Sequence, residues 1–135
     1  MTYLPPFDVI KKLIEISTVR GKPRVSVDYS DFISIIRSFL YNEKIDEEWY
    51  LGQYEDVAEA LKDGSIQCAT RHFVESGYFE GRLPFRLAVD EKWYLAQNPD
   101  VAESIRAGKV KSAQAHFQEN GYREGRLPFA SQKLP

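Results

Sequence analysis

The chain has 135 residues, of which 43% are hydrophobic and 28% are charged, and this composition fits a globular protein with one core rather than a disordered chain. Its formal net charge of -2 gives no overall attraction to nucleic acid or anionic lipid, and a single cysteine, Cys68, excludes an intramolecular disulfide and a cysteine-based metal cluster. The first residues lack the basic and apolar regions of a secretory signal, and the apolar runs are too short for a membrane span, so a cytoplasmic protein is expected.

The first 44 residues are more basic than the rest, with seven Lys or Arg residues against five Asp or Glu residues. Apolar residues at helical spacing predict a short amphipathic helix over residues 7–15. Residues 19–27 form a basic turn followed by the alternating Val25 and Val27. This pattern predicts at most one short strand, near residues 24–28.

A second helix is predicted over residues 30–41, and its apolar side is wide. Six of the nine residues from Phe32 to Leu40 are apolar, which is more than one buried stripe can take up. The helix is therefore either central to the core or part of an oligomer interface. The predicted strand also lacks a clear partner strand, and an unpaired strand edge tends to find another chain, most simply in a homodimer. The candidate interface residues are Val25, Val27, Phe32, Ile36 and Phe39.

Residues 45–85 and 89–129 are two copies of one unit, which align without a gap at a spacing of 44 with 23 of 41 positions identical. Two copies are fewer than the three or so that a solenoid usually needs, so the N-terminal region is expected to cap or dimerise them. The predicted organisation is an N-terminal helical region at 1–44, a first repeat at 45–88, a second repeat at 89–129 and a flexible tail at 130–135.

Each copy predicts three short helices, so the chain is expected to be all-α. Asp46 and its counterpart Asp90 are candidate N-caps of the first helix. The second helix is expected to start near Tyr54 in the first copy, and at Asn98 with a proline after it in the second. A glycine, Gly64 in the first copy, ends this helix.

The third helix of each copy has the clearest pattern. Ile66 and Phe73 lie at helical spacing with an alanine between them, and the pattern recurs 44 residues later. Gly77 is interpreted as the left-handed residue of a Schellman cap, in which Tyr78 contacts Phe73. Pro84 then predicts a turn.

His72 and His116 occupy the same position in the two copies. Repeated histidines suggest a metal site, but neither has a second His or Cys at ligand spacing, so no metal ligand and no cofactor is assigned. A structural histidine that bonds a nearby loop carbonyl is favoured, with a role in binding as the alternative.

Arg82 and Arg126 follow a Glu-Gly pair in each copy. Each could bind a carboxylate or phosphate, but a guanidinium that ties the turn to neighbouring helices is favoured. The repeated aromatic residues could stack on a sugar, although such residues more often form a core. The candidate partner-binding residues are Trp49, His72, Tyr78, Arg82, Trp93, His116, Tyr122 and Arg126.

No Ser-His-Asp order, phosphate-binding loop or HExxH pattern occurs in the sequence. The carboxylates lie mostly at helix starts and on polar faces. No catalytic residue is therefore assigned, and the chain is not expected to be an enzyme.

The shared pattern D-E-x-W-Y-L-x-Q-x-x-D-V-A, then G, then H-F-x-x-x-G-Y-x-E-G-R-L-P-F resembles a short repeat found in many bacterial proteins. Such units accompany glycosyltransferase, exopolysaccharide and large secreted calcium-binding repeat proteins. The resemblance covers both copies, about 82 of 135 residues, and departs from the usual Asn-Pro-Asp-Val at Tyr54-Glu55-Asp56-Val57. It implies a bacterial origin and a link to surface polysaccharide, but it transfers no catalytic residue.

The leading hypothesis is a non-enzymatic helical adaptor or regulator that binds a protein partner and forms a homo-oligomer. The first alternative is a nucleic-acid-binding transcriptional regulator, with Arg20, Lys22 and Arg24 as a basic wing. Against it, the helix at residues 30–41 carries one arginine and many apolar residues, whereas a helix that enters a groove needs polar side chains. The second alternative is a carbohydrate-binding module that uses the repeated aromatic residues.

Overall fold

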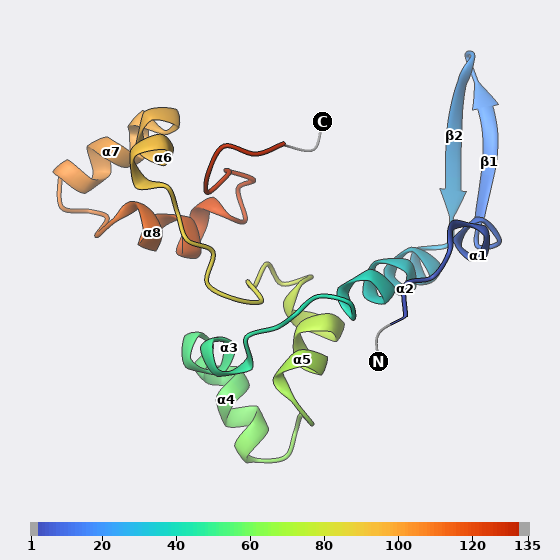
Figure 1. The fold of residues 1–135 in the computed structure, drawn as a ribbon, viewed down its shortest axis with the longest axis horizontal. Coiled ribbons are helices and arrows are strands. Elements are labelled where there is room, and N and C mark those ends of the chain that lie inside the picture. Colours follow the sequence, from blue (N-terminus) through green and yellow to red (C-terminus); the bar gives the residue numbers. More distant parts are fainter. Residues whose placement is uncertain (1–2, 133–135) are drawn as a thin grey trace.

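The N-terminal arm, residues 3–41, precedes two repeat units in a computed structural model that describes residues 3–132 (Figure 1). The tail predicted at 130–135 therefore lies partly outside the described residues. The arm ends in a helix that leads directly into the first repeat. Its elements are helix α1 (Phe7–Lys11), strands β1 (Ile14–Val19) and β2 (Lys22–Val27), and helix α2 (Tyr29–Leu40).

The prediction of an all-α fold is wrong, because β1 and β2 form a two-stranded antiparallel sheet. The fold is mixed, with about half of the residues in helices and a small sheet. The helix predicted over residues 7–15 ends at Lys11, and the strand that was expected to lack a partner pairs with β1. Residues 14–19 are rich in β-branched side chains, which favour an extended chain. Arg20 and Gly21 both adopt positive φ, 52° and 75°, as a two-residue hairpin turn of type I′ requires.

The hairpin separates apolar from polar side chains. Its register runs from Ile14 opposite Val27 to Val19 opposite Lys22, and side chains that lie opposite each other share a face. One face therefore carries Ile14, Ile16, Thr18, Pro23, Val25 and Val27. The other face carries Glu15, Ser17, Val19, Lys22, Arg24 and Ser26.

The two repeat units contain the same elements, and each element of the second lies 44 residues after its counterpart in the first. The first unit contains α3 (Glu47–Gln53), α4 (Glu55–Lys62), α5 (Ala69–His72) and a π-helical turn η1 (Phe73–Gly77). The second unit contains α6 (Glu91–Gln97), α7 (Pro99–Arg106), α8 (Ala113–His116) and the π-helical turn η2 (Phe117–Gly121).

Each unit closes on itself where its last residues return to its first helix. The Asp46 carboxylate caps α3 by accepting a hydrogen bond from the Trp49 amide at 3.0 Å, while the Asp46 amide donates to the Pro84 carbonyl at 3.1 Å. In the second unit the Asp90 amide donates to the Pro128 carbonyl at 3.0 Å. The turn at the end of each copy is thus hydrogen-bonded to the helix start of the same copy.

The core consists of two clusters. One contains Leu40 of α2 together with buried residues of the first unit, and Ile36 packs against it. The other contains Leu83 and buried residues of the second unit. Arg37 also fixes α2 to the first unit, because its Nη2 donates to the Glu75 carbonyl at 2.9 Å. The arm is therefore anchored at the C-terminal end of α2.

Gly77 is not the left-handed residue that the sequence analysis expected, and neither is its counterpart. The positive φ lies four residues later, at Gly81 (82°), and again at Gly125 (80°). The Schellman pair of hydrogen bonds also forms there, from the Arg82 amide to the Gly77 carbonyl at 2.9 Å and from the Gly81 amide to the Tyr78 carbonyl at 3.1 Å. The π-helical turn extends the third helix to Gly77, and Tyr78 after it is still right-handed, so the cap forms later.

Gly77 serves a different purpose, which is to let a tyrosine approach the helix. Tyr50 is fully buried, and a Cβ atom on Gly77 would collide with its hydroxyl. The same relation holds between Gly121 and Tyr94. Glycine is needed at both places because of space rather than backbone angle.

We predict that Gly77→Ala destabilises the protein by about 2 kcal/mol, because overpacking a filled core forces neighbouring groups to shift. In a Tyr50→Phe background the colliding oxygen is gone, so the same substitution should cost clearly less. Urea denaturation of the four variants measures this coupling.

Gly52→Ala is the matched control, since nothing lies within 4 Å of a Cβ built there and the second copy has Ala96 at this place. It should be neutral or stabilising by up to about 1 kcal/mol. An equal cost of Gly77→Ala in both backgrounds would show that the Tyr50 hydroxyl is not the constraint.

Candidate functional site

His72 and His116 bond a tyrosine rather than the loop carbonyl expected from the sequence. The Tyr50 hydroxyl lies 2.9 Å from His72 Nδ1, and the Tyr94 hydroxyl lies 2.8 Å from His116 Nδ1. Burial raises the pKa of both tyrosines, which keeps their hydroxyls protonated. A tyrosine hydroxyl that donates to Nδ1 leaves the ring proton of a neutral histidine on Nε2. In both units the histidine therefore satisfies a buried hydroxyl.

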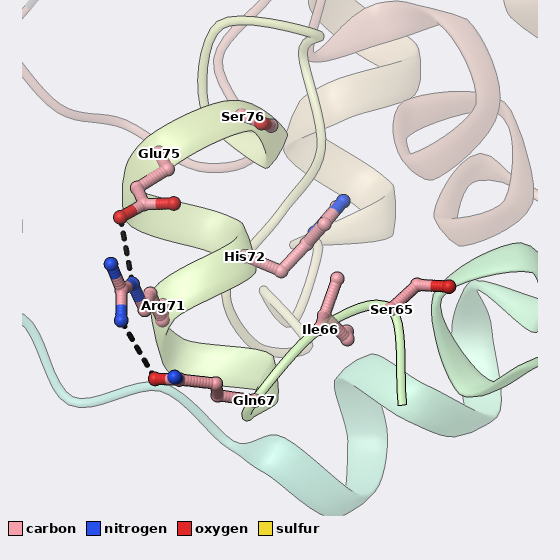
Figure 2. A pocket seen from close by; sticks show the side chains of 7 residues that line it. All are labelled: Ser65, Ile66, Gln67, Arg71, His72, Glu75 and Ser76. Atoms are coloured by element: carbon pink, nitrogen blue, oxygen red, sulfur yellow. Dashed lines mark hydrogen bonds and ion pairs between the residues drawn. The ribbon is translucent and has the colours of Figure 1, made fainter. Parts of the chain in front are cut away.

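A polar groove of about 300 Å³ lies beside His72, on the first unit (Figure 2). Arg71 is held in this groove, with Nε 2.8 Å from Glu75 Oε1 and Nη1 2.7 Å from Gln67 Oε1. The second unit has Ala115 in place of Arg71, so this network is not repeated. The groove is lined by Ser65, Ile66, Gln67, Arg71, His72, Glu75 and Ser76.

Arg82 ties the last turn of the first unit to its second helix. Its two terminal nitrogens donate to the two carboxylate oxygens of Asp56 at 2.8 and 2.7 Å, and its Nε donates to Glu80 at 3.1 Å. The guanidinium also lies over the ring of Tyr54, 4.9 Å from its centroid, which is a cation–π contact. The arginine is thus held on three sides by its own unit.

Arg126 makes the corresponding contacts in the second unit. It donates to both oxygens of Asp100 at 3.0 and 2.9 Å, to Glu124 at 3.2 Å and to the side-chain oxygen of Asn98 at 2.8 Å. Asn98 therefore replaces the ring of Tyr54 with a hydrogen bond. The acidic partners Asp56 and Asp100 were not singled out from the sequence, although the repeated Asp-Val of the D-V-A motif marks both of them.

These ion pairs shift the pKa values of their members. The hydrogen bonds from Arg82 lower the pKa of Asp56 to about 2, and the same bonds raise the pKa of the guanidinium. Arg126 lowers the pKa of Asp100 in the same way. A carboxyl whose pKa is lowered by folding stabilises the fold above its ordinary pKa near 4, and this contribution is lost as the pH falls toward 2.

We predict that Asp56→Asn flattens the loss of thermal stability between about pH 4 and pH 2. The effect should be below about 1 kcal/mol at neutral pH, because the Asp56 side chain is 66% exposed and solvent screens the pair. Melting temperatures measured across this range test it, with Glu59→Gln on the same helix as control. Parallel pH profiles for wild type and Asp56→Asn would contradict the assignment.

The aromatic candidates separate into two places. Trp49 and Trp93 are half-buried and pack against the second core cluster. Tyr78 and Tyr122 instead line one groove of about 210 Å³ where α2 and the two units meet. Burial raises the pKa of Tyr122. The predicted partner-binding residues therefore do not converge on one site, because the histidines and arginines are held within their own units.

The N-terminal arm carries two sets of partly exposed apolar side chains, each set on one face. We call Ile14, Ile16, Val25 and Val27 the hairpin face, and Tyr29, Phe32, Ile36 and Phe39 the α2 stripe. Ile16 is 55% and Val25 is 58% exposed; Tyr29 is 78%, Phe32 is 46% and Phe39 is 43% exposed. Val27 and Ile36 are half-buried. Of these, Ile14, Ile16 and Tyr29 were not among the predicted interface residues.

Sequence reasoning missed Ile14 because a helix was predicted over residues 7–15, and it missed Ile16 because residues 16–18 were assigned to no element. Their alternation with Glu15 and Ser17 is the signal that could have revealed them, since a strand with one apolar face alternates in this way. Tyr29 was missed because the predicted helix began one residue later. It lies three residues before Phe32, on the same helical side.

The basic residues of the hairpin are exposed at its free end. Arg20 lies in the turn, and Lys22 and Arg24 lie on the polar face of β2. Lys22 and Arg24 thus lie on the opposite side of the sheet from the hairpin's apolar face, and the turn of the hairpin points away from the repeat units (Figure 1).

No family model, no curated protein and no solved structure matches this chain. Within residues 3–132, no group of three or more His, Cys, Asp and Glu side chains could hold a metal ion. No helix in the described part of the chain is long and apolar enough to cross a membrane.

Proposed function

We propose that the chain is a non-enzymatic interaction module, an adaptor or regulator that binds protein through its N-terminal arm. The observation that carries this proposal is the concentration of exposed apolar side chains on the hairpin face and the α2 stripe. The repeat units then act as the scaffold to which the arm is fixed.

The size of the exposed surface supports a binding role. An aromatic side chain has an area of roughly 150–250 Å², so Tyr29, Phe32 and Phe39 together expose roughly 300 Å² at the fractions given above. Ile16 and Val25 add to this area. Apolar patches of about 300–600 Å² are the largest that a monomer usually carries, and they are often functional.

The contacts within the repeat units also support a scaffold role. His72 bonds Tyr50, while Arg82 bonds Asp56 and Glu80 of its own unit. These side chains stabilise the unit that carries them. The motif resemblance described above adds a context, in which the module regulates surface polysaccharide production in the cytoplasm of a bacterium.

Nucleic acid binding is a second candidate, favoured by the exposure of Arg20, Lys22 and Arg24 at the hairpin end. A two-stranded ribbon can enter a DNA groove, and basic side chains there would contact phosphates. The overall charge and the apolar α2 stripe favour protein binding instead.

We predict that a photo-reactive benzoylphenylalanine at position 32 captures protein in the native cell, because it retains the aromatic ring and lies on the exposed α2 stripe. The same probe at position 62, an exposed lysine on α4, is the control. Mass spectrometry identifies the adducts. If probes at positions 16, 25, 32 and 39 all yield no protein adduct, the arm is not a protein-binding surface.

We predict only weak binding of mixed-sequence duplex DNA, with an affinity that falls as salt rises. Replacing Arg20, Lys22 and Arg24 together by glutamine should abolish this binding. A fluorescence anisotropy titration at two salt concentrations measures both effects. Tight, sequence-selective binding would make nucleic acid the main ligand.

A further inference from the structure

The hairpin face lacks a covering layer within the described part of the chain. Residues 3–132 contain two strands, which pair only with each other. An isolated hairpin is marginally stable in water, and a sheet gains stability when a third strand or a helix covers its apolar face. Ile16 and Val25, at the middle of this face, are each more than half exposed. The hairpin therefore needs a cover from elsewhere.

The α2 stripe is the matching surface on the same chain. Tyr29, Phe32, Ile36 and Phe39 recur at intervals of three and four residues, which places them along one side of the helix. Ile36 already packs in part against the first core cluster, so the free area of the stripe comes from the three aromatic residues. Tyr29 and Phe32 are exposed near its start, and Phe39 is exposed near its end. A helix with such a stripe packs well against one face of a sheet.

These two surfaces cannot meet within one molecule. Strand β2 ends at Val27 and α2 begins at Tyr29, so Asp28 alone connects them. One residue is too short a link to fold a hairpin back along the helix that follows it. Figure 1 shows the result, with the hairpin standing away from α2 rather than lying along it. The arm is L-shaped, with the hairpin and α2 as its two limbs.

The limbs have similar lengths. Six residues of a strand span about 20 Å, and twelve residues of a helix span about 18 Å. We propose that two copies of this chain nest their arms about a two-fold axis, so that the hairpin face of each copy covers the α2 stripe of the other. This inference rests on the proposed role of the arm in binding protein, and it names a second copy as the partner.

A second copy fits better than an unrelated protein because each molecule carries both halves of the contact. One two-fold axis then covers four apolar surfaces at once, the hairpin face and the α2 stripe of each copy. Charge is also consistent with this arrangement. When the corners of the two arms meet, the hairpin end with Arg20 and Lys22 reaches the C-terminal end of the partner's helix. Helix C-termini attract cations, Glu43 follows α2 in the chain, and the guanidinium of Arg37 in the last turn of α2 is bound to the Glu75 carbonyl of its own unit.

The first test is the mass of the full-length protein in solution, measured by sedimentation at tens of micromolar. The wild type should be a dimer. Val25→Glu and Phe32→Lys should each weaken the dimer at least about 100-fold, because each buries an unpaired charge in the contact. Ser26→Glu, on the polar face of the same strand, and Ser34→Lys, at an exposed position of α2 outside the stripe, are the matched controls and should remain dimeric.

The second test mixes the Val25→Glu variant with the Phe32→Lys variant. In a mixed dimer, one hairpin–helix contact is unaltered, and the other brings the introduced carboxylate against the introduced ammonium group. Dimers should therefore reappear when the two variants are mixed at equal ratio. Trp49 and Trp93 both lie in the repeat units, and their fluorescence during thermal melting shows whether each variant keeps these units folded.

Three results would overturn this inference. The first is a monomeric wild type. The second is a Val25→Glu or Phe32→Lys variant that stays dimeric, and the third is an equal mixture of these two variants that stays monomeric. A monomeric wild type whose position-32 probe captures another protein would reject the second copy but leave the proposed function intact. If the photo-reactive probes at positions 16, 25, 32 and 39 all form no protein adduct, the proposed function itself is rejected.

Discussion

Each repeat unit depends on a tyrosine hydroxyl buried at its centre. A polar atom in such a place must be hydrogen-bonded, and His72 meets this need for Tyr50 from the third helix. The bond requires the third helix to lie close to the ring, and Gly77 permits this approach because it has no side chain. The aromatic core, the histidine and the glycine of the motif therefore form a single interaction, which Tyr94, His116 and Gly121 repeat in the second unit.

The repeat units could be predicted from sequence further than the arm could. Their helix starts follow from side chains that act locally, such as Asp46 at an N-cap, and duplication showed where a unit begins and ends. The role of Gly77 could not be predicted, because a left-handed cap and a close approach both call for glycine. Only the position of Tyr50, 27 residues earlier in the chain, distinguishes the two. The hairpin was missed because Ile14 fits helical spacing as well as strand alternation.

In the candidate site, too, local contacts could be predicted from the sequence, whereas contacts between distant residues could not. Arg82 was favoured for internal contacts, since a guanidinium beside a turn has carbonyls and carboxylates within reach, but it was also kept as a candidate partner-binding residue. Its partner Asp56 lies 26 residues away and becomes a neighbour only when the second helix packs against the last turn. Val25 and Phe32 were expected at an interface, but the reason given, an unpaired strand, was incorrect. Their exposure follows instead from the short link at Asp28, which holds two apolar limbs apart.

The hydrogen bond between Asp46 and the Pro84 carbonyl has a consequence for how such chains can change length. Because this bond brings the start and end of a unit together, a unit can be gained or lost by recombination without exposing the backbone of its neighbours. The segment between units, residues 86–88, needs only to reach the next N-cap. A gene of this kind can therefore grow or shrink by steps of 44 codons with each closing hydrogen bond kept, provided that another unit follows to cover Leu83 and Trp49, which pack in the second core cluster.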